Sequence, residues 1–276
     1  MRIDSHQHFW EYDPVRDTWI NDTMGAIRKD FLPQHLKPIL DTNNIHGCIA
    51  VQADQSETET NFLLTLAKNN TFIKGVVGWV DLRAENIEEQ LAHFSKNKKL
   101  KGLRHVMQVE ADNFMLRKEF QNGISKLAQF DLTYDILVFP PQLKSVIELV
   151  KKFPNQPFVV DHLAKPYIKN GKIKEWKNTI QVLAKHPNVY CKVSGMVTEA
   201  HLKHWKPSDF TSYLDVIFNA FGVDRIMYGS DWPVCLLAAN YKEQLHIIEE
   251  FITSFSDSEK EKIMGRNAVE FYNVSR

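Results

Sequence analysis

The chain opens with a His-x-His pair, and two further motifs with His and Asp end apolar runs much later in the sequence. The pair lies in Asp4-Ser5-His6-Gln7-His8, and the later motifs are centred on His162 and Asp231. Because alternate side chains of a β-strand point to opposite faces, Asp4, His6 and His8 are expected to point the same way. These distant residues can converge only if the fold brings distant strands together. A closed parallel barrel does so, and the residue types favour hydrolytic chemistry.

Eight short apolar runs are spaced along the chain and predict eight strands. Several of these runs lack alternation with polar residues, which is typical of parallel strands that are covered on both faces. The expected strands cover residues 3–8, 47–52, 74–80, 102–107, 133–138, 158–162, 189–194 and 226–230.

Amphipathic stretches fall between these runs, with apolar residues three and four apart, as on the buried face of a helix. A helix should start at Pro33, although Pro38 is expected to make it short or late. Ser256-Asp257-Ser258-Glu259 has the form of a capping box and should begin a last helix that ends near Phe271. The other expected helices cover residues 57–68, 86–95, 119–130, 142–153, 175–185, 210–221 and 241–255.

Eight strand–helix units in succession predict an α/β fold, a single (β/α)8 barrel of the TIM type. The competing fold is a doubly wound open sheet, but no Gly-rich phosphate turn follows an early strand. No linker rich in Pro, Gly or Ser divides the chain, so residues 1–276 are expected to form one domain.

The composition excludes some classes of partner. Lys plus Arg and Asp plus Glu both number 34, and this balance argues against a nucleic-acid surface, which would be basic. No apolar run approaches the length of a membrane span, and no signal peptide is visible, so we expect a cytoplasmic protein without membrane contact. The three cysteines, Cys48, Cys191 and Cys235, do not have the spacing of a disulfide framework or a zinc knuckle.

His6 and His8 are the strongest candidates for chemistry, because neutral imidazoles bind zinc and similar metals well. His162 and Asp231 are placed at the ends of the sixth and eighth expected strands, where catalytic groups of such barrels gather. Gly229 and Pro233 flank Asp231 and indicate a fixed backbone around it. The structural alternative for Asp231 is a helix N-cap.

The order of these motifs closely resembles that of the amidohydrolase superfamily. The three motifs are Asp-x-His-x-His at 4–8, Asp-His-Leu-Ala-Lys-Pro at 161–166 and Gly-Ser-Asp-Trp-Pro at 229–233. More narrowly, the chain resembles the branch of sugar lactonases, which includes enzymes for L-fucono-lactones, L-rhamnono-lactones and 2-pyrone-4,6-dicarboxylate. Further matching stretches lie at residues 6–10, 51–53, 101–106 and 265–268, so the resemblance spans essentially the whole chain.

The resemblance implies a role for each matching residue. Asp231 would be the general base on the attacking water, and Arg104 would hold the lactone carbonyl or a hydroxyl. His162 would belong both to the catalytic group and to a single metal site. That metal site would consist of His6, His8, His162 and Asp231. Weaker candidates for contacting substrate are Trp10, Gln52, His105, Asp135, Lys165 and Trp232. The alternative is ordinary packing for the two tryptophans and a surface position for Lys165.

The chain departs from members of the superfamily that hold two metals. The fourth strand ends Arg104-His105-Val106-Met107, and the fifth reads Thr133-Tyr134-Asp135-Ile136-Leu137, so neither offers a lysine to bridge two metals. One divalent cation, zinc or manganese, is the most that the resemblance implies. Some lactonases of this branch are thought to work without metal, and an activated ester demands less assistance than an amide.

The function expected from the resemblance is hydrolysis of a small sugar lactone of the L-fucono or L-rhamnono type to its aldonic acid. A metal-dependent decarboxylase of the same superfamily is the enzymatic alternative, because related members share the His-x-His pair and the late Asp. A barrel that only binds a sugar acid is the non-enzymatic alternative, since fold alone does not guarantee catalysis.

Overall fold

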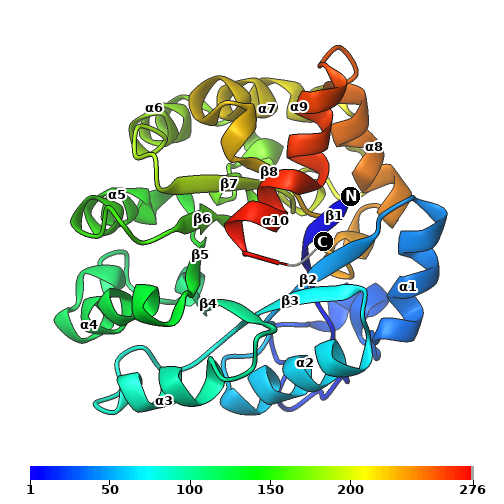
Figure 1. The fold of residues 1–276 in the computed structure, drawn as a ribbon. Coiled ribbons are helices and arrows are strands. Elements are labelled where there is room, and N and C mark those ends of the chain that lie inside the picture. Colours follow the sequence, from blue (N-terminus) through cyan, green and yellow to red (C-terminus); the bar gives the residue numbers. More distant parts are fainter. Residues whose placement is uncertain (275–276) are drawn as a thin grey trace.

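The eight expected strands form one parallel sheet in the computed structural model, which describes residues 1–274. The strands follow one another in sequence order from β1 to β8, and the sheet curls into a barrel with the helices outside (Figure 1). The predicted (β/α)8 barrel is confirmed. The strands are β1 (Ile3–Gln7), β2 (Gly47–Val51), β3 (Ile73–Gly78), β4 (Leu100–Val106), β5 (Thr133–Leu137), β6 (Phe158–Val160), β7 (Val189–Val193) and β8 (Ile226–Tyr228).

The helices also follow the expected pattern. The first begins at Pro33 and continues through Pro38 without delay, because Pro38 lies on its exposed side, where water can satisfy the carbonyl that loses its partner. Ser256 caps Glu259 as predicted, but a π-helical turn at Lys262–Arg266 divides the last helix. The helices are α1 (Pro33–Thr42), α2 (Glu57–Asn69), α3 (Ile87–Phe94), α4 (Lys118–Leu127), α5 (Leu143–Lys152), α6 (Lys174–Leu183), α7 (Ser208–Phe221), α8 (Tyr241–Phe251), α9 (Asp257–Glu261) and α10 (Asn267–Phe271).

Backbone bonds just beyond β8 join the last strand to the first. The amide of Asp231 donates to the carbonyl of His6 at 2.8 Å, and the amide of His8 donates to the carbonyl of Trp232 at 2.7 Å. The barrel is therefore closed by the residues that carry the two most distant motifs.

Asp4 does not share a face with His6 and His8, contrary to the alternation expected from the sequence. A register irregularity lies between Asp4 and Gln7 of β1, and it breaks the period of two. The Asp4 carboxylate accepts bonds from the amides of Ser230 at 2.9 Å and His6 at 3.1 Å, and from the Tyr241 hydroxyl of α8 at 3.0 Å. Asp4 thus links β1 to the turn after β8 and to α8.

The C-terminal segment covers the end of the barrel where the strands begin. Figure 1 shows α10 lying across the middle of the barrel. Its aromatic residues join an apolar layer inside the barrel, so this end is filled by side chains. The layer contains Ile3, Ile49, Val51, Val77, Val159, Met227, Phe271, Tyr272 and Val274. Within residues 1–274, none of the helices combines the length and hydropathy needed to cross a bilayer.

We predict that Asp4→Ala destabilises the protein by about 3 kcal/mol or more, because it leaves three buried donors without an acceptor. Urea unfolding of the purified variant measures this loss. Asp41→Ala is the control: its carboxylate pairs with Lys37 on the surface of α1 and should cost no more than about 0.5 kcal/mol. Equal midpoints for the two variants would contradict the role of Asp4 in closing the barrel.

Candidate active site

Three imidazoles and one carboxylate converge at the end of the barrel where the strands finish. The Nε2 atoms of His6, His8 and His162 lie 3.9, 3.4 and 3.8 Å from Asp231 Oδ1. The two Nε2 atoms of the His-x-His pair are 3.2 Å apart. All four residues are buried, and Asp231 is only 2% exposed. The residues singled out in three distant motifs therefore form one cluster.

Each of these histidines is held by a partner at its other ring nitrogen. His8 Nδ1 lies 2.8 Å from the carbonyl of Val51, so it must carry the proton that this contact requires. His6 Nδ1 lies 3.3 Å from Asp161 Oδ1, and His162 Nδ1 lies 2.8 Å from Ser194 Oγ. These contacts direct all three Nε2 atoms toward Asp231, as in metal sites, where a partner behind the imidazole fixes its orientation.

The donor atoms of His6, His8 and Asp231 lie within 4.8 Å of one another, close enough to share one small divalent cation, whereas His162 forms a second such group with His6 and Asp161. Ligands at zinc distances in a tetrahedron stand about 3.3 Å apart, and the contacts of 3.2 and 3.4 Å that His8 makes with His6 and Asp231 match that spacing. With a proton on Nδ1 of both rings, the facing Nε2 atoms of His6 and His8 present lone pairs to each other. A cation or a proton between them removes this repulsion.

The backbone that carries His162 is a left-handed turn. Strand β6 ends at Val160, two residues earlier than expected, and the four residues that begin at His162 all have positive φ, between 46° and 56°. Left-handed backbone costs a non-glycine residue about 1–2 kcal/mol. Asp231 also has positive φ, 57°, and lies three residues beyond the end of β8. Backbone strain is thus concentrated in two segments of the site, as is common for functional residues.

Gly195, just after β7, makes room for the His162 ring. A Cβ at this glycine would lie 2.5 Å from His162 Nδ1, and the residue itself has φ +60°. Glycine is the residue that satisfies both demands at once. The turn after β7 therefore supports the imidazole through Gly195 on one side and the neighbouring Ser194 hydroxyl on the other.

Arg104 enters the same cluster from β4. Its Nη1 lies 3.1 Å from Asp161 Oδ2 and 3.3 Å from His6 Nε2, while Nη2 donates to Gln52 Oε1 at 3.0 Å and to the Gln52 carbonyl. The Arg104 Nε–H is buried and has no partner within residues 1–274. The guanidinium is rigidly held, and one of its N–H donors is left without an acceptor in the described chain.

The charge state of the cluster follows from burial and from its neighbours. Burial alone would raise the pKa of Asp231, but His162 and His8 bring that pKa below its usual value. Burial lowers the pKa of both His6 and His162 well below 6.5. At neutral pH the site therefore combines an ionised carboxylate with neutral imidazoles, the form in which histidine can bind a metal.

His105 and Asp135 make their contacts within the protein. The His105 ring stacks on Phe114 beside α4, accepts a bond from Trp79 Nε1 at 3.2 Å and lies 3.0 Å from Glu110. Alternation along β4 turns His105 away from the barrel interior that Arg104 faces. Asp135 is fully buried, and its Oδ2 is taken up by Lys192 and the Tyr272 hydroxyl.

The remaining three candidates lie around the cluster. Trp232 is 1% exposed and packs edge-on against Phe31, while Trp10 donates its indole N–H to the carbonyl of Lys29. Lys165 ends the left-handed turn and pairs with Glu199 at 2.7 Å, with about a sixth of each side chain exposed. Of these three residues, only Lys165 offers a charged group near the solvent.

Sequence reasoning missed the polar residues beneath the cluster. Asp161, Ser194 and Lys192 are fully buried, and all three contact a histidine of the site. The signal was present for Lys192, because a lysine inside the apolar run Val189–Val193 is almost never buried without a partner.

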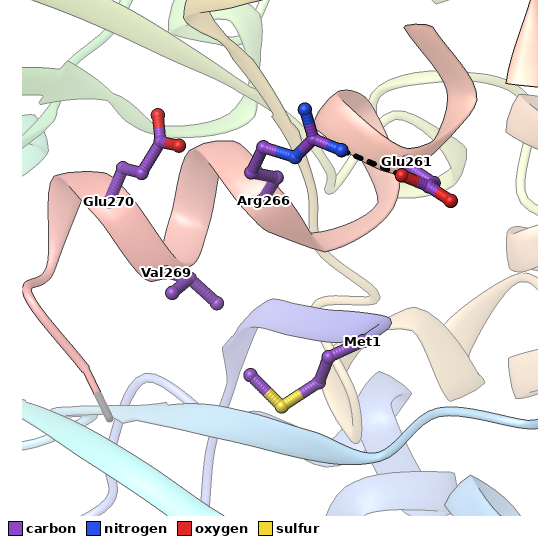
Figure 2. Close-up of a pocket in the computed structure, with 5 residues that line it drawn as sticks. All are labelled: Met1, Glu261, Arg266, Val269 and Glu270. Atoms are coloured by element: carbon purple, nitrogen blue, oxygen red, sulfur yellow. Dashed lines mark hydrogen bonds and ion pairs between the residues drawn. The ribbon is translucent and has the colours of Figure 1, made fainter. Parts of the chain in front are cut away.

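A surface pocket of about 190 Å³ lies at the other end of the barrel, between the N-terminus and the last helices (Figure 2). Met1, Val269 and Glu270 line it together with Arg266 and Glu261, which pair with each other at 2.7 Å. Because its charged arginine is already paired and no histidine lines it, this pocket offers none of the chemistry of the His–Asp cluster.

Comparisons with known proteins agree on one family. Residues 3–274 match the model of the Amidohydrolase family Amidohydro_2. L-fucono-1,5-lactonase of Burkholderia multivorans is 39% identical over 99% of this chain and 96% of its own length, and that of Burkholderia ambifaria is 33% identical over 100% and 97%. A crystal structure of a Burkholderia multivorans amidohydrolase with bound zinc superposes with a TM-score of 0.96 at 39% identity and covers both chains completely.

We predict that Gly195→Ala displaces His162 and destabilises the protein more than Gly171→Ala does. Both glycines have similar positive φ, 60° and 64°, but nothing lies within 4 Å of a Cβ at Gly171. Gly171→Ala should therefore cost only the backbone term, about 1–2 kcal/mol. Urea unfolding of both variants measures the difference, and equal costs would show that the Cβ at position 195 is accommodated without moving the ring.

We also predict that protonation of His6 and His162 favours unfolding of the metal-free protein as the pH falls below about 6.5, against the opposite contribution of buried carboxyls such as Glu59 and Asp4, whose pKa burial raises to about 8 and about 6. In the unfolded chain His6 and His162 take up protons there, whereas burial keeps them neutral in the folded chain, so protons favour unfolding. Each contributes a slope of up to about 1.4 kcal/mol per pH unit. Urea unfolding between about pH 7.5 and 5.5 measures the slope. His6→Asn should reduce it and the exposed His93→Asn should not; an unchanged slope in His6→Asn would contradict the assignment.

Proposed function

Because this chain belongs to the amidohydrolase family, we propose that it is a lactonase that opens a sugar lactone to the aldonic acid. The observation that carries the proposal is the ionised Asp231 carboxylate, surrounded by three imidazoles and accompanied by Arg104. Two full-length relatives named L-fucono-1,5-lactonase support a sugar lactone, and L-fucono-1,5-lactone is the first substrate to test.

In this proposal Asp231 is the general base. Its carboxylate removes a proton from water as the water oxygen attacks the lactone carbonyl, and the tetrahedral intermediate forms. When that intermediate collapses, the bond to the ring oxygen breaks, and Asp231 returns the proton to the leaving oxygen. The product is the open hydroxy acid, and the carboxylate is regenerated.

Arg104 is assigned to the oxyanion. Its Nε–H has no partner in the described chain, and Asp161 and Gln52 hold the rest of the guanidinium in place. A donor that is fixed before the reaction stabilises developing negative charge without reorganisation. The low exposure of the cluster strengthens this effect, because charge interactions are screened less away from water.

One divalent cation would be held by the Nε2 atoms of His6, His8 and His162 together with Asp231. When bound, such a cation supplies Lewis acidity and lowers the pKa of water. The spacing of the His6, His8 and Asp231 donor atoms, the 3.8 Å between His162 Nε2 and Asp231 Oδ1, and the zinc in the crystal structure of the Burkholderia multivorans protein support this assignment. Among the weaker candidates, Lys165 with Glu199 is assigned to substrate hydroxyls, because an ammonium beside a carboxylate offers both a donor and an acceptor.

We predict that Asp231→Asn lowers kcat for lactone hydrolysis by about 10²–10⁴-fold, because the amide cannot accept the proton. Proton release from a panel of aldonolactones, followed with a pH-indicator dye, measures the rates. Asp41→Asn, on the surface of α1, is the matched control and should keep the activity of the parent protein. Full activity of Asp231→Asn would refute this mechanism, and inactivity of the parent protein on every lactone would refute the proposed function.

We further predict that exhaustive chelation lowers the lactonase rate and that zinc or manganese restores it. The reason is that the neutral imidazoles and the Asp231 carboxylate form a donor set suited to such cations. The same dye assay before and after chelation, with metal content measured in parallel, gives the result. A rate that survives complete metal removal would refute the metal assignment and leave Asp231 and Arg104 as the catalytic groups.

A further inference from the structure

A lysine lies inside the barrel beneath the His–Asp cluster. Lys192, the fourth residue of β7, is 0% exposed. Its Nζ lies 2.5 Å from Asp135 Oδ2, 3.0 Å from Asp161 Oδ1 and 3.2 Å from His6 Nδ1. An ammonium group in a barrel core is costly unless it is paired on several sides. These contacts offset the desolvation of the ammonium group, and they place the lysine directly behind His6 of the site.

Asp161 connects Lys192 to the reacting end of the barrel. One carboxylate oxygen contacts Lys192 and, at 3.3 Å, His6 Nδ1, while the other contacts Arg104 at 3.1 Å. Burial alone would raise the pKa of Asp161, but Lys192 and His6 hold it well below its usual range. An ionised carboxylate in this place sets the orientation of both the imidazole and the guanidinium.

The chain of contacts continues to the opposite end of the barrel. The Tyr272 hydroxyl donates to Asp135 Oδ2 at 2.7 Å, and Lys192 Nζ lies 5.4 Å from the centre of the Tyr272 ring. Tyr272 follows α10 and is 1% exposed, within the segment that covers the end of the barrel (Figure 1). The C-terminal segment thus reaches Lys192 both directly and through Asp135.

We propose that Lys192 is a positioning residue for the proposed reaction: it fixes Asp161 so that His6 and Arg104 keep their orientation, and Tyr272 supports it from below. In this arrangement Lys192 donates to Asp135 and forms an ion pair with Asp161, and a proton on His6 Nδ1 faces the same Asp161 oxygen. The Nε2 lone pair of His6 then faces the cluster, where a metal ligand needs it. The inference rests on the proposed function, and its test also has a readout that does not depend on activity.

The principal test is Lys192→Met, which keeps the length of the side chain and removes its charge. We expect zinc affinity, measured by competition with a chromogenic chelator, to fall about 10–100-fold, as for other losses of a group behind a metal ligand. We expect kcat on a lactone to fall by a similar factor while KM changes less than about threefold. The absorption spectrum of the cobalt-loaded protein should change as His6 loses its fixed orientation.

Two further variants separate positioning from stability. Lys192→Met/Asp135→Asn removes one charge of each sign, so it should recover thermal stability but not zinc affinity or kcat. Tyr272→Phe, which loses only the hydroxyl contact, should lower zinc affinity and kcat in the same direction by a smaller factor. Tyr272→Phe also tests the positioning role if the Lys192 variants do not fold.

The matched controls are Lys99→Met and Tyr213→Phe. Lys99 donates to the Ile73 carbonyl near the start of β4, and the buried Tyr213 hydroxyl has no partner within residues 1–274. Neither variant should alter zinc affinity or kcat.

Different results overturn the two proposals. If folded Lys192→Met and Tyr272→Phe keep the zinc affinity, cobalt spectrum and kcat of the parent protein, the positioning role is wrong whatever the substrate. If the double variant recovers zinc affinity and kcat together with stability, Lys192 only balances charge, and the inference is also overturned. If the parent protein binds zinc but hydrolyses no lactone, the proposed function fails, and weaker zinc binding in Lys192→Met still supports the positioning role. A parent protein that neither binds zinc nor hydrolyses a lactone overturns both.

Discussion

The closure of the barrel between β8 and β1 is the constraint on which the site depends. The bonds that close it run from Asp231 to His6 and from His8 to Trp232, so the backbone of the candidate site also completes the barrel. Asp4 strengthens this junction between β8 and β1, because its carboxylate accepts hydrogen bonds from the amides of Ser230 and His6. Because the imidazoles and the carboxylate belong to residues that are bonded to each other, their relative position is fixed by the fold rather than by mobile loops.

The structure stores backbone strain in the segments that carry these groups. The left-handed turn from His162 to Lys165 and the positive φ of Asp231 are each unfavourable for residues with a side chain. Contacts around them compensate for this cost: Ser194 holds the His162 ring, and the Asp231 backbone is bonded to β1. The strain directs a histidine and a carboxylate from two different strands toward one point.

The interior of the barrel changes character from one end to the other. Near the start of the strands it is apolar and covered by the C-terminal aromatic residues, whereas toward the site it contains two cations and two carboxylates that pair with one another. Replacing such a buried network by apolar residues often does not reduce stability. The contacts of this network with His6 and Arg104 indicate that it holds these two side chains in their orientation toward the site.

The barrel, most of the helices and the residues that converge could be predicted from the sequence, because periodic burial and motif order are local properties of the chain. The sequence predicted His6, His8, His162, Asp231 and Arg104, and the structure brings these five together. Only the tertiary structure showed which way Asp4 faces, since a strand irregularity is not a local property of the sequence. It alone revealed the partners of Lys192, because buried charges are paired by residues from other strands, and no spacing along the chain records which strands those are.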